Sequence, residues 1–221
     1  MTAKSRKTAP EGEVVILLHG LARTARAMKK MEKALGDAGY LVVNQGYPST
    51  RHSIPELAAQ TLPKALARCP EHGPIHFVTH SMGGILLRQY LSQHPLSRMG
   101  RAVMLGPPNQ GSEAVDRLRE WRPFQWFNGP AGGQMGTGPD SLPVQLGPVN
   151  FPLGVIAGNR TINLLLSTLL PGPNDGKVTV ERTRVAGMQD HCVLPVTHPF
   201  MMQDKRVIEQ VKVFLATGAF A

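Results

Sequence analysis

Cysteine, aromatic and charged residues are scarce in this chain of 221 residues. Its two cysteines, Cys69 and Cys192, cannot form a disulfide framework, and their spacing matches no zinc motif. Aromatic residues make up 5% of the sequence and charged residues 18%, whereas 42% is hydrophobic. No apolar run approaches the ~20 residues that a transmembrane helix needs. These values predict a globular chain with reduced thiols and exclude a disulfide-stapled miniprotein, a disordered tail and a membrane span.

The first ten residues carry Lys4, Arg6 and Lys7, but only a short apolar run at 14–18 follows them. That run is too short for the apolar region of a signal peptide, and no cleavage site accompanies it. We therefore expect a cytoplasmic protein in which a frayed leader precedes the first strand. The length predicts one domain that spans 1–221, because α/β domains often reach about 250 residues.

Basic residues outnumber acidic ones by 24 to 15, which gives a net charge of +9. They are distributed over separate segments, at 29–33, 117–122 and 182–184, without interleaved aromatic side chains. Because no DNA-binding motif accompanies them, we expect no nucleic-acid partner. The charge leaves an anionic lipid or substrate surface open as a partner.

Short apolar runs alternate along the chain with segments of helical periodicity. Strands are predicted at 13–18, 40–43, 75–79, 101–105, 153–157 and 184–194. Helices are predicted at 25–38, 55–69, 81–94 and 203–214. Strands that alternate with helices of this length form right-handed crossovers. The sequence therefore predicts an α/β fold with a mostly parallel central sheet flanked by helices.

One stretch interrupts this alternation. Residues 106–148 include eight glycines and seven prolines. The stretch also contains four aromatic residues, Trp121, Phe124, Trp126 and Phe127. Long irregular connections in compact domains are usually functional. We interpret 107–150 as an irregular insertion that acts as a lid or substrate-binding loop, in which the aromatic residues either bind substrate or only hold the loop in place.

The segment Thr79-His80-Ser81-Met82-Gly83 lies where a buried strand must turn directly into a helix. Such a turn strains the backbone of its central residue and exposes that side chain at the carboxyl edge of the sheet. The residues two before and two after it should be small, which Gly83 satisfies fully and Thr79 only partly. Ser81 is therefore a candidate nucleophile, and a serine that only caps a helix is the alternative.

Four segments, each at the carboxyl end of a predicted strand, carry a resemblance to a known family. They are His-Gly at 19–20, His-Ser-Met-Gly-Gly at 80–84, Gly-Pro-Pro-Asn-Gln-Gly-Ser at 106–112 and Asn-Asp-Gly-Lys-Val at 174–178. In this order they resemble the α/β-hydrolase superfamily and, within it, the compact bacterial and fungal lipases. The resemblance spans nearly the whole chain. Thr79 departs from the usual glycine, although some of those lipases have alanine or threonine there.

In that superfamily the catalytic acid follows the serine, and the histidine follows the acid. The resemblance implies Asp175 as the acid and His198, between the last strand and the last helix, as the base. His191, within or beside the last strand, and Asp190 are the alternatives. Other aspartates between the serine and the base are Asp116 and Asp140. The implied oxyanion donors are the backbone amides of Leu21 and Met82.

The implied reaction is hydrolysis of a small lipophilic carboxylic ester through an acyl-enzyme on Ser81. The four aromatic residues of the insertion, together with the apolar segment 164–170, are expected to bind the acyl chain. A thioesterase or acyltransferase would use the same triad, and a catalytically silent binding scaffold is the alternative outside enzymes. No metal or other cofactor is expected, because no metal-ligand spacing and no phosphate-binding loop occur.

Overall fold

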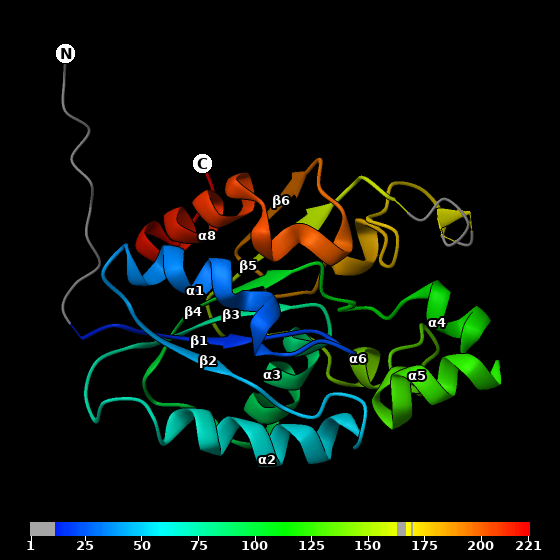
Figure 1. Cartoon of the computed structure of the whole chain (residues 1–221), viewed down its shortest axis with the longest axis horizontal. Helices are drawn as coiled ribbons and strands as arrows, with labels where there is room; N and C mark the ends of the chain where they lie inside the picture. Colours follow the sequence, from blue (N-terminus) through cyan, green and yellow to red (C-terminus); the bar gives the residue numbers. More distant parts are fainter. Residues whose placement is uncertain (1–11, 163–166, 169) are drawn as a thin grey trace.

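The computed structural model describes residues 12–162, 167–168 and 170–221, with a sheet of six strands at its centre (Figure 1). The strands are β1 (Val14–Leu18), β2 (Leu41–Gln45), β3 (Ile75–His80), β4 (Met99–Leu105), β5 (Leu153–Gly158) and β6 (Asp190–Leu194). Their order is β2-β1-β3-β4-β5-β6, and all neighbours are parallel. The predicted α/β fold is confirmed. The expected leader and most of the apolar segment 164–170 lie outside the described residues.

Helices cover both faces of the sheet (Figure 1). They are α1 (Lys29–Gly36), α2 (Ile54–Leu66), α3 (Met82–Gln93) and α8 (Lys205–Thr217). Strand β1 shows how its side chains serve both layers. Val15 and Leu17 join the apolar cluster of α1 and α8, whereas Val14, Ile16 and Leu18 join the cluster of α2 and α3. The continuous apolar run therefore forms a strand that is buried on both faces.

Two predicted elements differ from the structure at their ends. The helix predicted at 25–38 begins with one 3-10 turn, η1 (Ala25–Met28), before α1. The last strand was expected at 184–194 but covers only Asp190–Leu194, after a second 3-10 turn, η2 (Glu181–Thr183). Gly187 has a φ of +88°, and a Cβ there would lie 2.0 Å from the carbonyl oxygen of Val149. Such a backbone cannot continue a strand, so β6 starts later.

The glycine- and proline-rich segment 107–150 was expected to be irregular, but it contains three helices. They are α4 (Glu113–Leu118), α5 (Arg122–Gly133) and α6 (Leu142–Gln145). Pro123 and Pro143 lie in first turns, where a missing N–H costs no helical hydrogen bond. Gly129, with φ 59° and ψ −166°, bends α5 just before Pro130. These helices lie beyond the carboxyl ends of the strands, where the candidate site is also found (Figure 1).

A buried arginine connects α3 to this helical segment. The Arg88 guanidinium donates hydrogen bonds to the carbonyl oxygens of Asn109, Pro143 and Gly147, at 2.9, 3.1 and 2.6 Å, and to the side-chain oxygen of Asn109 at 3.2 Å. Burial lowers the pKa of Arg88 to about 10, so it stays protonated at neutral pH. The Arg88 side chain therefore connects both ends of the segment 107–150 to α3.

We predict that Arg88→Met lowers the free energy of unfolding by about 2–3 kcal/mol, because it leaves buried carbonyl groups without donors. Urea unfolding followed by far-UV circular dichroism measures this change. The matched control is Arg68→Met, because Arg68 is exposed and its guanidinium donates to the side chain of Gln45 at 3.3 Å. Equal stabilities of the two variants would contradict the prediction.

Candidate active site

Ser81 occupies the sharp bend that the sequence predicts between β3 and α3. Its φ of 53° and ψ of −124° lie in a region that residues with a side chain rarely adopt. Among the described residues, Ala22 is the other non-glycine residue with a positive φ. The bend places the Ser81 hydroxyl at the carboxyl edge of the sheet and at the N-terminus of α3.

Glycines on both sides of the bend allow the backbones to approach closely. A Cβ at Gly83 would lie 2.7 Å from the carbonyl oxygen of Leu18. A Cβ at Gly20 would lie 3.1 Å from the Cβ of Ser81. A Cβ at Gly84 would lie 3.2 Å from the hydroxyl oxygen of Thr79, so Gly84 leaves room for threonine where related bends have glycine. The departure at Thr79 is therefore compatible with the predicted turn.

The structure brings Ser81, His198 and Asp175 into one hydrogen-bonded chain. The Nε2 atom of His198 lies 3.0 Å from the Oγ of Ser81, and its Nδ1 lies 2.7 Å from the Oδ2 of Asp175. If Nδ1 carries the proton, it donates to the carboxylate, and Nε2 accepts from the serine hydroxyl. Asp175 and His198 are buried, whereas Ser81 is partly accessible.

The Asp175 carboxylate and the His198 backbone are also held from other directions. The Oδ1 of Asp175 accepts hydrogen bonds from the backbone N–H groups of Lys177 and Val178, at 3.0 and 2.9 Å. The backbone N–H of His198 donates to the carbonyl oxygen of Asp175 at 3.0 Å. Asp175 and His198 are thus joined through both side chain and backbone at the start of η3 (His198–Gln203).

His80 is a neighbour of this group that the sequence analysis did not single out. Its Nε2 lies 3.0 Å from the carbonyl oxygen of His198, so it donates to that oxygen as an N–H. Burial lowers the pKa of His80 well below its usual value, and charge on His198 lowers it further. His80 is therefore neutral at neutral pH. Its place directly before the serine was the available signal, but the contact depends on a residue 118 positions away.

Gly106 is a second neighbour of this group, and the sequence predicts no role for it. Its φ is +53°, and a Cβ there would lie 2.9 Å from the Oδ2 of Asp175 and 3.1 Å from the Nδ1 of His198. Any larger residue would therefore press on the hydrogen bond between Asp175 and His198. A glycine directly after β4 was the available signal.

The loop after β1 carries the first expected oxyanion donor. The ring of His19 stacks on Tyr47, with centroids 4.1 Å apart, and its Nε2 accepts from the Tyr47 N–H at 3.3 Å. The N–H of Ala22 donates to the Oγ of Ser49 at 3.1 Å. These contacts fix the loop on both sides of Leu21. Among the described residues, the amides of Leu21 and Met82 donate no hydrogen bond outside regular helices and strands.

The alternative acid and base lie elsewhere. The Nε2 of His191, on β6, lies 2.9 Å from the Oγ1 of Thr183, and burial lowers the pKa of His191 to about 4. Asp190 begins β6, at the amino edge of the sheet, and accepts from the Phe220 N–H at 2.8 Å. The carboxylate of Asp116 accepts from Thr137. None of these three side chains contacts Ser81 among the described atoms.

The four aromatic residues expected to bind substrate do not form one enclosed pocket. Phe124 is partly buried and packs against the core. Trp121, Trp126 and Phe127 are exposed on the outer side of α5 and just before it. The structure therefore separates one inward aromatic side chain from three that face water.

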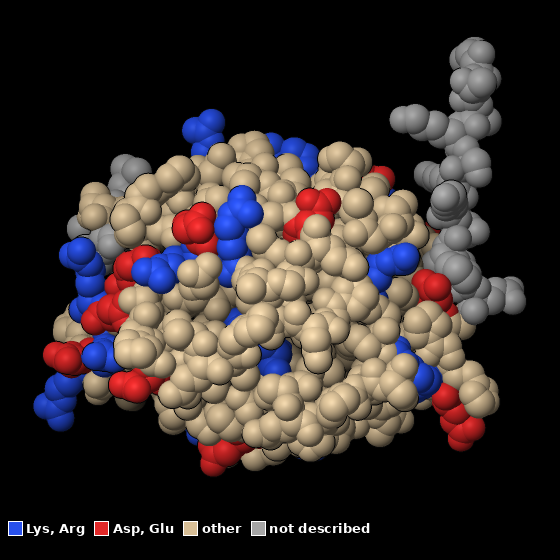
Figure 2. Space-filling model, turned by 180° about the vertical axis from the view of Figure 1, so that it is seen from behind, with Lys and Arg blue, Asp and Glu red and all other residues tan. Residues whose placement is uncertain are grey.

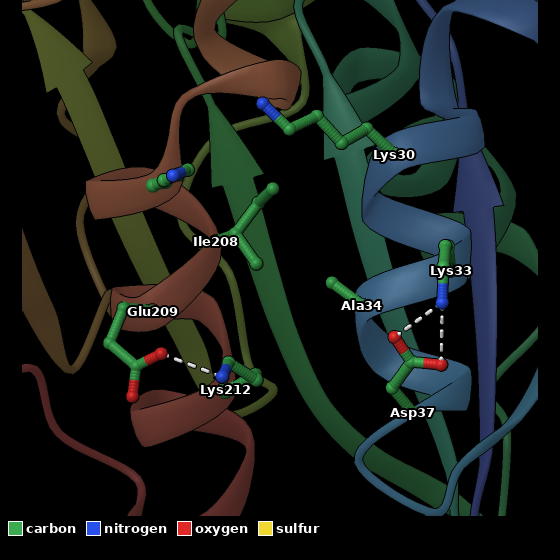
Figure 3. Close-up of a pocket in the computed structure, with 8 residues that line it drawn as sticks. Lys30, Lys33, Ala34, Asp37, Ile208, Glu209 and Lys212 are labelled. Carbon is green, nitrogen blue, oxygen red and sulfur yellow. Dashed lines mark hydrogen bonds and ion pairs between the residues drawn. The ribbon is translucent and has the colours of Figure 1, made fainter.

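A groove of about 350 Å³ lies between α1 and α8 (Figure 3). Its lining includes several lysines, but two of them form ion pairs with nearby carboxylates, Lys33 with Asp37 at 2.8 Å and Lys212 with Glu209 at 2.6 Å. No residue of the hydrogen-bonded chain described above lines this groove. It is therefore separate from the candidate active site.

The described residues contain neither a metal-binding cluster nor a membrane-spanning helix. No group of three or more His, Cys, Asp or Glu side chains there is placed to hold a metal ion. In the same part of the chain, no helix has the length and apolar character needed to cross a bilayer. On the face that Figure 2 shows, basic side chains are interspersed with acidic ones and form no continuous stripe.

Solved structures with the same architecture include lipases and esterases. The mature form of Bacillus licheniformis lipase BlEst2 has a TM-score of 0.67 at 20% identity, covering 96% of this chain and 94% of that chain. A metagenomic carboxyl esterase has a TM-score of 0.66 at 19% identity, covering 86% and 66%. Phospholipase PlaB from Legionella pneumophila has a TM-score of 0.64 at 17% identity, covering 78% and 45%. At these identities the likeness shows a shared fold.

Sequence comparison gives a more specific result. A protein of Mycobacterium phage D29, described as a candidate non-heme haloperoxidase, is 31% identical over 120 residues, which is 51% of this chain and 42% of that relative. The family model described as "Alpha/beta hydrolase family" matches residues 15–210. That range includes the strained bend, the acid and the base. This chain belongs to the alpha/beta hydrolase family.

Proposed function

We propose that this protein is a serine carboxylic-ester hydrolase of the esterase or lipase type that acts on lipophilic esters. One observation carries the proposal: an imidazole that lies 3.0 Å from a serine hydroxyl at a strained bend is also bonded to a buried carboxylate. A serine hydroxyl is a weak nucleophile alone, and this arrangement supplies the base and fixes its tautomer. The lipase and esterase structures of the same fold support the ester class.

In the proposed cycle, the Oγ of Ser81 attacks the ester carbonyl carbon while His198 takes the hydroxyl proton. The tetrahedral intermediate collapses, the C–O bond to the alcohol breaks, and His198 returns the proton to the leaving oxygen. Water then attacks the acyl-enzyme with His198 again as base, and the acid is released. Asp175 stays ionised and stabilises the imidazolium in both halves.

The negative charge of each tetrahedral intermediate needs donors that are already in position. The amides of Met82, at the start of α3, and of Leu21, in the loop after β1, are the proposed pair. The helix N-terminus at Met82 adds a favourable partial positive charge. The contact of Gly20 with Ser81 supports this pairing, because it holds the loop of Leu21 beside the nucleophile.

The same acyl-enzyme can pass its acyl group to a different acceptor, so a thioesterase or acyltransferase activity uses identical residues. A catalytically silent scaffold is the alternative of a different class. Labelling by a fluorophosphonate separates the classes, since it requires an activated serine. We expect one adduct on Ser81 by mass spectrometry of the intact protein, and unlabelled protein would favour the scaffold.

We predict that the protein cleaves p-nitrophenyl esters and that Ser81→Ala abolishes this activity. Asp175→Asn should lower kcat by ~10⁴, because the base loses its correct tautomer. Steady-state rates on a chain-length series of these esters provide the measurement. The matched controls are His191→Gln and Asp190→Asn, which change the rejected alternatives and should retain activity. If no ester of any length is cleaved in a Ser81-dependent way, the proposed function is wrong.

A second prediction concerns His80, which we expect to position His198 without touching substrate. Glutamine can place its amide N–H near the Nε2 position and donate to the His198 carbonyl, whereas asparagine is too short. His80→Asn should therefore lower kcat by about 10- to 100-fold with little change in KM, because a small displacement of the base is costly. His80→Gln should recover most of the rate. Equal rates in the two variants, at equal thermal stability, would assign His80 a packing role only.

A further inference from the structure

The outer side of α5 exposes aromatic side chains where a surface helix normally carries polar ones. Trp126 is 81% exposed, Phe127 65% and Trp121 61%. The rings of Trp126 and Phe127 meet edge to face, with centroids 4.8 Å apart. The core side of the same helix is already packed, through Phe124 and Ala131. Large exposed aromatic side chains that lie close together in this way indicate an interaction site.

Three arginines lie close to these aromatic residues in the sequence. Arg117, Arg119 and Arg122 are exposed, and none of them forms an ion pair within the described part of the chain. Glu120 is the one acidic residue between 117 and 127, so this stretch has a net charge of +2. Exposed aromatic rings beside unpaired guanidinium groups suit a partner that is both apolar and anionic. We call this set of three aromatic residues and three arginines the α5 surface.

A hollow of about 350 Å³ adjoins the α5 surface. It is lined by Arg119, Phe124, Gln125, Gly129, Pro130 and Gly133. Its one charged side chain is a cation, and most of the remaining lining is apolar or glycine. An anionic headgroup can therefore lie at Arg119 with apolar atoms against Phe124.

The helix that carries part of the α5 surface also packs against the loop of the first expected oxyanion donor. A Cβ at Gly132 would lie 3.5 Å from the side chain of Leu21, so the second half of α5 packs beside the loop after β1. Arg23, in that loop, and Lys177, two residues after the acid, add positive charge near the site. Burial lowers the pKa of Lys177, and the positive charge of Arg23 lowers it further.

We propose that the α5 surface binds an anionic lipid surface and thereby holds the active site at it. The aromatic rings would enter the boundary between headgroups and acyl chains, and the arginines would pair with the phosphate groups. This inference rests on the proposed function for its purpose, because a lipophilic ester would be taken from that lipid surface. The binding itself needs no catalysis and can be measured separately.

The experiment uses the two tryptophans of the chain, both of which belong to the α5 surface. Ser81→Ala protein is mixed with vesicles of phosphatidylglycerol or of phosphatidylcholine, and tryptophan emission and co-sedimentation are recorded. We expect a blue shift and binding to phosphatidylglycerol that is at least about tenfold tighter than to phosphatidylcholine and weakens in ~0.5 M salt. The proposal would be overturned if phosphatidylglycerol vesicles neither shift the tryptophan emission nor co-sediment with the protein.

Paired variants locate the contact. The double variant Trp126→Ser with Phe127→Ser should bind phosphatidylglycerol vesicles about tenfold or more weakly. The reason is that the two large apolar side chains that binding would bury are absent. The matched control, Leu41→Ser, removes an apolar side chain that is 51% exposed on β2 and should bind like the parent. Equal binding by all three proteins would overturn the proposal. If the parent protein and Leu41→Ser are dimers and the double variant is a monomer, the α5 surface binds a second copy of the chain. That result would also overturn the proposal.

A third measurement separates this proposal from the proposed function. Hydrolysis of a water-soluble short-chain ester by the unmodified protein tests the chemistry without any lipid surface. If the protein hydrolyses the ester but does not bind vesicles, the proposed lipid binding is wrong and the proposed ester hydrolysis stands. Vesicle binding without Ser81-dependent hydrolysis supports the lipid surface and contradicts the ester hydrolase.

Discussion

The close approach of α3 to the end of β1 is the constraint on which the candidate site depends. It exists because Gly83 has no side chain that would meet the carbonyl groups of Leu18 and His19. This approach holds Ser81 in its strained conformation and brings the loop of Leu21 beside it. Asp175 follows β5 and His198 follows β6, and their loops meet at one edge because all strands are parallel and end there. The site thus follows from backbone packing before any side-chain chemistry is considered.

The insertion at 107–150 is coupled to this arrangement through Arg88. Three backbone carbonyl groups from both ends of the segment converge on one guanidinium on α3, the helix that begins directly after Ser81. Because no carboxylate takes part, the contact depends on complete hydrogen bonding of a buried cation. The insertion is therefore packed against the core where it contacts Arg88, whereas the outer side of α5 faces water.

Local pattern and chain order predict a large part of the fold and of the candidate site. Apolar runs locate the strands, and the motif around Ser81 predicts the bend because the strain there is local. The helix α5 was missed because glycine and proline content was taken to exclude helices, although proline fits a first turn. The roles of His80 and Gly106 depend on contacts with His198 and Asp175 across the sheet edge, which spacing along the chain does not reveal.

The position of both tryptophans, one on α5 and one directly before it, also affects how unfolding of this protein is observed. With 61% and 81% of their surfaces already in water, the indole rings change environment little when the sheet melts. A denaturation curve recorded by indole fluorescence would describe one peripheral helix, while the buried strands lose their structure with little change in fluorescence. A natural sequence change at Trp121 or Trp126 would alter the fluorescence spectrum of the whole protein and leave its buried core unchanged.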